Sequence, residues 1–139
     1  MYINKFFQIS ILALSVVGCS SNASSQSGQG QSAQAEVVQI DATEFTKMST
    51  DSNTIIIDVR TPGEVASGYI PGTKYFIDIN GSSFETQIEA LDTNKTYLVY
   101  CRSGARSGRA ADFMVSNGFK KVYNLQGGIM NWPGEIKKD

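Results

Sequence analysis

From residue 36 onward, the hydrophobic pattern alternates between strand-like runs and helix-like amphipathic stretches. Residues 54–59, apart from Asp58, and residues 96–100 are runs of β-branched, aromatic and aliphatic side chains, which is typical of strands buried on both faces. Residues 84–91 and 106–117 instead carry apolar side chains at helical spacing, and Gly118 follows as the expected residue after a helix C-terminus. The pattern therefore predicts a domain built from alternating strands and helices.

Shorter elements complete the pattern. We expect strands over residues 36–40, 74–77 and 121–125, helices over 42–48 and from 61, and a short helix after 126–128 that holds Trp132. Asp41 and Thr61 are the expected N-caps, with Pro62 at the first helical position. Such alternation predicts an α/β fold with a parallel sheet and helices on both faces. Ligands bind such sheets at the carboxyl ends of strands, where Asp58 and Cys101 fall.

The first 18 residues have the features of a signal peptide. Lys5 supplies a positive charge, and the apolar stretch over residues 6–17 is shorter than the roughly 20 residues that cross a bilayer. Small residues precede Cys19, and the segment resembles a bacterial lipobox. We therefore expect lipidation of Cys19 and an exported, membrane-anchored lipoprotein that faces the periplasm or the cell exterior. The alternative is an ordinary secretory peptide in which Cys19 is incidental.

A polar segment separates this peptide from the domain. Residues 20–35 contain only Ser, Gln, Gly, Ala and Asn, so they cannot bury enough apolar surface to fold. We predict that residues 19–35 form the lipidated cysteine and a flexible tether, and that 36–139 form one domain.

Composition excludes several classes of function. The net charge of −1 gives no electrostatic footprint for nucleic acid, and the lack of histidine removes Cys–His catalysis and nearly every zinc site. We expect no metal, no cofactor and a monomer. If Cys19 carries lipid, Cys101 is the only thiol of the mature chain, and without a CxxC pair a thiol–disulfide oxidoreductase is disfavoured.

Cys101 is the strongest candidate for chemistry. It ends an apolar strand and directly precedes a helix, so the free amides and the positive end of the helix dipole face its side chain. Arg102 and Arg106 add positive charge nearby. Such surroundings lower a cysteine pKa from about 8.5 towards roughly 3.5–7.5, and the thiolate is the nucleophile. The alternative for Cys101 is a small buried hydrophobe.

Several stretches together resemble the rhodanese family of single-domain sulfurtransferases. They are IDVRTP at 57–62 with Glu64, GYIPG at 68–72, YCRSGARS at 100–107, and LQGG at 125–128 with Trp132. The resemblance implies a five-stranded parallel sheet with helices on both faces. It also implies transfer of a sulfane sulfur, from a small anionic donor such as thiosulfate to a thiol or cyanide acceptor, through a persulfide on Cys101.

The same resemblance assigns the site residues. The amides of Arg102, Ser103, Gly104, Ala105 and Arg106 would cradle the thiolate and then the persulfide, and Arg102 would attract the donor. Asp58 and Arg60 are placed near the substrate, although both are also plausible as scaffold. The alternative function is a membrane-tethered sulfur carrier or binding module without turnover, which would serve a protein sulfur acceptor.

The sequence departs from the rhodanese pattern at two positions, and one of them bears on the choice of sulfur donor. Tyr69 stands where the family often has histidine, at what we take to be a scaffold position, and Ser103 stands where thiosulfate users often carry a second basic residue, so the donor could be another sulfane compound. Cysteine phosphatases and related arsenate reductases place five residues between cysteine and arginine. Here four residues separate Cys101 from Arg106, and Ser107 occupies the position of the phosphatase arginine, which disfavours a phosphatase or an arsenate reductase.

Overall fold

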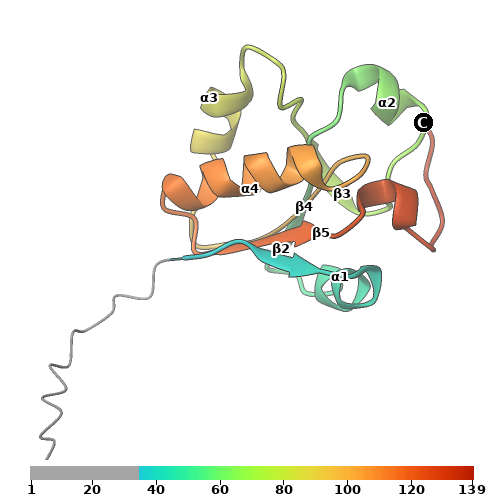
Figure 1. Cartoon of the computed structure of the whole chain (residues 1–139), viewed down its shortest axis with the longest axis horizontal. Helices are drawn as coiled ribbons and strands as arrows, with labels where there is room; N and C mark the ends of the chain where they lie inside the picture. The colour runs from blue at the N-terminus through green and yellow to red at the C-terminus, as the bar shows by residue number, and fades with distance from the viewer. Residues whose placement is uncertain (1–34) are drawn as a thin grey trace, which may run out of the picture. The chain divides into compact units, whose positions relative to one another are not determined.

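Five short strands form one parallel sheet in the computed structural model, which describes residues 35–139 (Figure 1). The strands are β1 (Val38–Ile40), β2 (Thr54–Asp58), β3 (Thr73–Phe76), β4 (Thr96–Tyr100) and β5 (Lys121–Leu125). Their order in the sheet is β1-β5-β4-β2-β3, and every pairing is parallel. The predicted five-stranded parallel sheet is confirmed.

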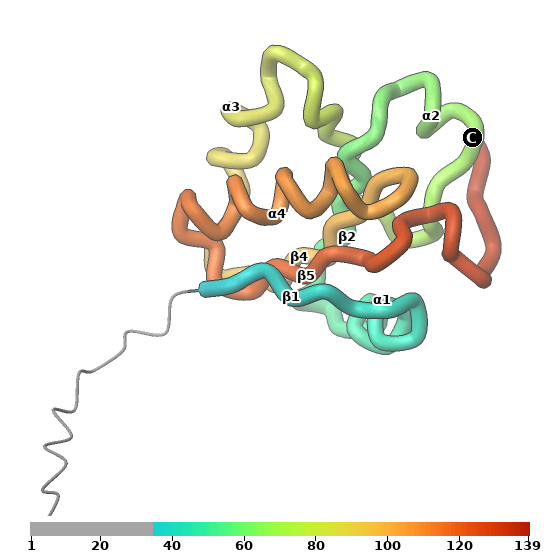
Figure 2. The backbone as a smooth tube through the Cα atoms, in the orientation of Figure 1, coloured from blue at the N-terminus to red at the C-terminus, as the bar shows by residue number. Residues whose placement is uncertain are grey.

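Helices cover both faces of this sheet, also as predicted. They are α1 (Ala42–Ser49), α2 (Pro62–Ala66), α3 (Phe84–Glu89), α4 (Ala105–Ser116) and the 3₁₀ helix η1 (Gly128–Asn131). One core cluster includes Phe84 and Ile88 of α3 with Ala110 and Met114 of α4. The other face is covered by α1, whose Phe45 is fully buried, and by the η1 segment. Figure 2 shows α1 on the opposite side of the sheet from α3 and α4.

The predicted elements differ from the observed ones only at their ends. The first strand begins at Val38 rather than at residue 36, and β2 ends at Asp58. The third helix stops at Glu89 because Ala90 caps it, two residues before the predicted end. The predicted N-caps are both present, since Asp41 accepts from the Glu44 N–H and Thr61 forms a complete capping box with Glu64.

The C-terminal segment makes a contact that the pattern did not predict. Lys137 pairs with Tyr69 in an antiparallel bridge, with both N–H···O distances at 2.9 Å. The Tyr69 hydroxyl also donates to Asp139 at 2.8 Å. The end of the chain therefore lies beside α2, as Figure 1 shows.

The expected signal peptide, Cys19 and nearly all of the tether fall on residues 1–34, outside the described residues. Within residues 35–139, no helix is long and apolar enough to cross a membrane.

The carboxyl ends of β2 and β4 lie level with each other. Asp58 is the register partner of Tyr100, and the Val59 N–H donates to the Tyr100 carbonyl at 3.1 Å. The segments that follow the two strands therefore start from the same edge of the sheet. This alignment places residues 58–64 beside the loop that Cys101 begins.

Gly128 lets η1 approach that loop closely. The N–H groups of Ile129 and Met130 donate to the carbonyls of Cys101 and Arg102 at 2.9 and 3.1 Å. Gly128 has φ 60°, and a Cβ there would lie 2.5 Å from the Arg102 oxygen and 2.6 Å from the Cys101 oxygen. Both the conformation and the spacing therefore require glycine.

We predict that Gly128→Ala lowers the free energy of unfolding by about 2 kcal/mol or more, because the methyl group would meet backbone and the φ is left-handed. Thermal or urea denaturation measures the loss. Gly63→Ala is the matched control, since Gly63 lies in α2 with nothing within 4 Å of its added Cβ. It should be neutral or stabilising by up to about 1 kcal/mol. Equal stability of the two variants would contradict the packing of η1 on the loop.

Candidate active site

Cys101 lies directly after β4 and is fully buried. Its Sγ accepts hydrogen bonds from the Gly104 N–H at 3.1 Å and from the Ser107 hydroxyl at 3.3 Å. Both donors belong to the loop and the first turn of α4. The sulfur is therefore enclosed by the segment that follows it, and Gly104 is one of the five residues whose amides we expect to cradle it.

A left-handed residue makes this loop possible. Gly104 is the N-cap of α4 and has φ 98°, a conformation that side chains other than glycine rarely adopt. The turn points the Gly104 N–H back at the sulfur three residues earlier. A Cβ on Gly104 would also lie 3.3 Å from the Gly127 nitrogen and from the Leu125 oxygen, so the loop packs closely on the segment after β5.

The thiol of Cys101 has a lowered pKa. Burial is the largest influence and acts to raise the pKa, because it disfavours the charged thiolate. Hydrogen bonds from the Ser107 hydroxyl and from the N–H groups of Ser107, Gly104 and Ser103 outweigh it, so the pKa falls below its ordinary value. The sulfur is thus prepared as an anion by neutral donors.

The two arginines of the loop differ in environment. Arg106 donates to both carboxylate oxygens of Glu64, at 2.8 and 2.6 Å, and the side chains are 23% and 28% exposed. Chiefly because of this hydrogen bonding, the pKa of Glu64 falls to about 2. The charge of Arg106 is therefore engaged by the Glu64 carboxylate.

Arg102 is exposed, as are Ser103 and Ala105, so the outer surface of the loop is open to solvent. Within residues 35–139, the Arg102 side chain has no hydrogen-bond or ion-pair partner. Its guanidinium is therefore the cation of this loop that remains available to an anionic ligand.

Asp58 and Arg60 are engaged with each other. Asp58 is fully buried and Arg60 is 6% exposed, and the Arg60 guanidinium reaches Asp58 Oδ2 at 2.6 Å. The same guanidinium donates to the Gly68 carbonyl at 2.8 Å, which ties the end of β2 to the turn after α2. This geometry favours the scaffold interpretation of the pair over substrate contact.

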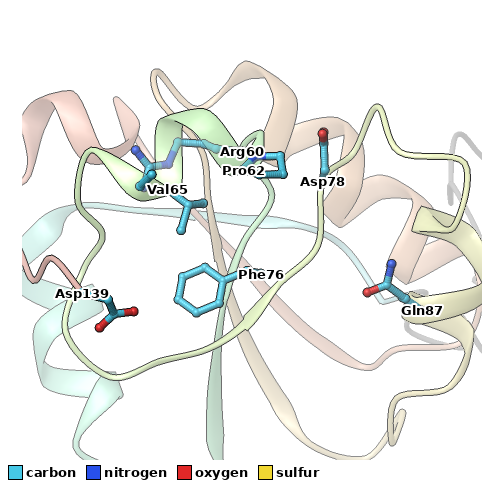
Figure 3. A pocket seen from close by; sticks show the side chains of 8 residues that line it. Arg60, Pro62, Val65, Phe76, Asp78, Gln87 and Asp139 are labelled. Carbon is cyan, nitrogen blue, oxygen red and sulfur yellow. The ribbon is translucent and has the colours of Figure 1, made fainter.

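A cavity of about 490 Å³ lies beside α2 and β3, away from the sulfur. Figure 3 shows side chains that line it, among them Val65 and Phe76, with Asp78 and Asp139 on different sides. Arg60 lines it but Cys101 does not. Within residues 35–139, no group of three or more ligand side chains could hold a metal ion.

Sequence reasoning missed two residues of this site. Ser107 was noted only for its spacing, yet its buried hydroxyl contacts the sulfur. Its position in the first turn of the helix after a reactive cysteine is the signal that could have identified it. Glu64 was noted only as part of a motif, and only the fold brings it to Arg106, 42 positions later.

Comparisons with known proteins agree with this geometry. Residues 41–135 match the family model described as a rhodanese-like domain. YtwF of Bacillus subtilis, which is named provisionally as a sulfurtransferase, is 40% identical over 91 residues, which cover 66% of this chain and 84% of YtwF. A sulfurtransferase of Allochromatium vinosum is 31% identical over 97 residues, 69% of this chain and 88% of that protein.

Other relatives are larger. A tRNA uridine(34) hydroxylase of Buchnera aphidicola is 32% identical over 108 residues, but these cover only 32% of its length. Among solved structures, a rhodanese-like domain protein from Staphylococcus aureus superposes with a TM-score of 0.63 at 28% identity, covering 73% of this chain and 98% of that one. The family match, the relatives of similar length and the shared fold agree, so this chain belongs to the rhodanese-like family and has sulfurtransferases among its relatives.

Proposed function

We propose that this protein is a sulfurtransferase in which Cys101 carries the transferred sulfur as a persulfide. The observation that carries the proposal is the buried Cys101 Sγ, which accepts from the Gly104 N–H and the Ser107 hydroxyl inside a loop of amides. Successive N–H groups that converge on one point stabilise an anion without side-chain charge. The sulfurtransferase relatives support the same reaction class.

In the first half-reaction, the Cys101 thiolate attacks the outer sulfur of a donor such as thiosulfate. The new bond to Cys101 Sγ forms as the sulfur–sulfur bond of the donor breaks, and the bonding electrons leave with sulfite. A thiolate and a thiosulfate dianion thus become a persulfide anion and a sulfite dianion, so atoms and charge balance. The hydrogen bonds on Cys101 Sγ lower the pKa of the thiol, which favours the thiolate without a histidine base.

In the second half-reaction, a nucleophilic acceptor removes the outer sulfur. Cyanide, for example, attacks that sulfur, the persulfide bond breaks, and the electrons return to Cys101 Sγ as thiocyanate leaves. Because the donors on Cys101 Sγ stabilise a sulfur anion, they favour the released thiolate as a leaving group.

The amount of positive charge at the site affects which sulfur donor it can attract. Arg106 is neutralised by Glu64, and Ser103 brings no charge, so Arg102 is left to attract a dianionic donor. One exposed guanidinium is compatible with thiosulfate, and equally with a donor of lower charge such as a persulfide of a small thiol. Thiosulfate is therefore the first donor to test.

We predict that the wild-type protein forms thiocyanate from thiosulfate and cyanide with many turnovers, and that Cys101→Ser forms none, because the hydroxyl is not ionised at neutral pH. Colorimetric thiocyanate detection measures the rate. Mass spectrometry after thiosulfate alone should show wild type heavier by one sulfur atom, and Cys101→Ser unchanged.

The outcomes separate enzyme from carrier. The one-sulfur adduct without turnover would identify a stoichiometric sulfur carrier whose acceptor is a protein. Neither adduct nor thiocyanate, with thiosulfate and then with a small-thiol persulfide as donor, would overturn sulfur transfer by Cys101.

We further predict that Arg102→Ala raises the KM for thiosulfate about tenfold or more, since a charge-assisted contact contributes roughly 1.5–3 kcal/mol. Steady-state kinetics measure it. Arg109→Ala is the matched control, because Arg109 is exposed one turn further along α4 and should leave KM unchanged. If both variants keep the wild-type KM, Arg102 does not bind the donor.

We also propose that lipid on Cys19 anchors the domain to a membrane, facing the periplasm or the cell exterior. Support comes from the sequence: a positive residue, a short apolar stretch and small residues precede Cys19, and a polar segment separates it from the domain. More than one acyl chain would give stable anchoring, which one chain alone does not.

We predict that Cys19→Ala abolishes lipidation and moves the protein from the membrane pellet to the supernatant of fractionated bacterial cells. Wild type should stay in the pellet after a high-salt wash, because acyl chains are not displaced by ions. Cys101→Ser is the matched cysteine control and should fractionate as wild type does. A Cys19→Ala protein that still sediments with membranes after the wash would contradict the anchor.

A further inference from the structure

The carbonyl of Gly104 has more donors than it can bind. The Gly108 N–H donates to it at 2.9 Å, and the Ser107 hydroxyl and the Asn124 side-chain Nδ2 each reach it at 3.1 Å. A carbonyl oxygen has two lone pairs, so two of these donors satisfy it. The third is surplus.

Ser107 is the donor with an alternative. Its hydroxyl has one proton and lies within reach of two acceptors, the Gly104 oxygen at 3.1 Å and Cys101 Sγ at 3.3 Å. The Gly108 N–H is fixed by the helix, and Asn124 Nδ2 has only oxygen acceptors, the Gly104 carbonyl and Gln39 Oε1. If Gly108 and Asn124 fill the carbonyl, the Ser107 proton is free to point at the sulfur.

Asn124 is an unusual residue for its place. Asn124 lies in β5 and is the register partner of Val99 in β4, and Val99 comes two residues before Cys101. The strands β4 and β5 are neighbours in the sheet (Figure 2). Asn124 is 3% exposed, and within residues 35–139 nothing donates to its buried Oδ1. A half-satisfied amide in a buried strand is unfavourable, and an apolar residue would avoid that cost. The contacts that an apolar residue would lose here are the donations to the Gly104 carbonyl and to Gln39 Oε1, and only the first of these lies beside the sulfur site.

We propose that Asn124 is a positioning residue of the sulfur site: its amide occupies the Gly104 carbonyl, and this commits the single Ser107 proton to Cys101 Sγ. The inference rests on the proposed sulfur chemistry of Cys101. Asn124 does not touch the sulfur and acts only through Gly104 and Ser107.

The charged side chains around the sulfur do not involve Asn124. Arg106, in the first turn of α4, is paired with Glu64 from α2, and Asp78 from the segment after β3 also acts on Arg106. Arg102 is exposed on the loop. None of these groups contacts Asn124, so replacing Asn124 by a neutral residue leaves the charges around the thiolate unchanged.

The test measures the Cys101 thiolate itself, by its ultraviolet absorbance and by the pH dependence of alkylation with iodoacetamide. The protein used is the full chain with Cys19→Ala, so that one thiol remains. We expect Asn124→Leu to raise the thiolate pKa by about one pH unit, close to the effect of Ser107→Ala. The variant that combines Asn124→Leu with Ser107→Ala should raise the thiolate pKa no more than the larger of the two single shifts. Both changes remove the same hydrogen bond, from the Ser107 hydroxyl to Cys101 Sγ.

Gln39→Ala is the matched control. It removes the other partner of the Asn124 amide, Gln39 Oε1 at 2.8 Å, but leaves the contact with Gly104 intact, so the thiolate pKa should stay that of wild type. A shift in Gln39→Ala as large as in Asn124→Leu would mean that general loosening of β5 moves the pKa, and it would overturn the proposal. So would an unshifted pKa in Asn124→Leu or in Ser107→Ala, or fully additive shifts in the double variant.

A second measurement does not depend on the variant folding. In the otherwise wild-type chain, the side-chain amide protons of Asn124 should shift in the NMR spectrum with the same midpoint as the Cys101 thiolate, because the thiolate strengthens the Ser107 hydrogen bond to Cys101 Sγ and so alters the Gly104 carbonyl that Asn124 also contacts. This titration should vanish in Cys101→Ser, and its absence in the wild-type chain would overturn the proposal. Neither readout requires sulfur transfer, so a failed thiocyanate assay and a failed positioning role are distinguishable.

Discussion

The hydrogen bonds on Cys101 Sγ are the interaction on which the rest of this structure depends. The sulfur is fully buried, and burial alone would keep it protonated and unreactive. The Gly104 N–H and the Ser107 hydroxyl reverse that effect without bringing a charge into the interior. The left-handed turn at Gly104 and the close approach of Gly128 both serve to hold these donors in place.

Much of the fold could be predicted from the sequence, because its elements are specified locally. The runs at 54–59 and 96–100 are apolar apart from Thr54, Asp58 and Thr96, and such runs are typical of strands in a parallel sheet with helices on both faces. Thr61, Pro62 and Glu64 specify the start of α2 within four residues. Predictions erred mainly at element ends, such as Glu89, where the last turn of a helix depends on its packing as well as on its own sequence.

The site was predictable only in part. Cys101 and its amide loop could be recognised because strand, cysteine, glycine and helix follow one another directly in the chain. The pairing of Arg106 with Glu64 and the contact of Asn124 with Gly104 join residues 42 and 20 positions apart, so only the assembled sheet and helices bring them together. The bridge between Tyr69 and Lys137 was missed for the same reason. Asp58 and Arg60 follow a strand at the end of the sheet where ligands bind, so the sequence marks them as candidate site residues. That their side chains pair with each other depends on side-chain geometry, which the sequence does not show.

This arrangement separates the activation of sulfur from the binding of the donor. Ser107 stands where a cysteine phosphatase has its arginine, so the loop offers a hydroxyl at short range where an oxyanion would need a guanidinium. Such a loop fits a single anionic sulfur. In the sulfur transfer that we propose, the rest of a donor would lie outside the loop, towards the exposed Arg102, while Arg106 is held by Glu64 and stabilises the contact of α2 with α4. Donor preference could then change through residues on the outer surface, such as Ser103, without disturbing the buried hydrogen-bond donors to Cys101 Sγ.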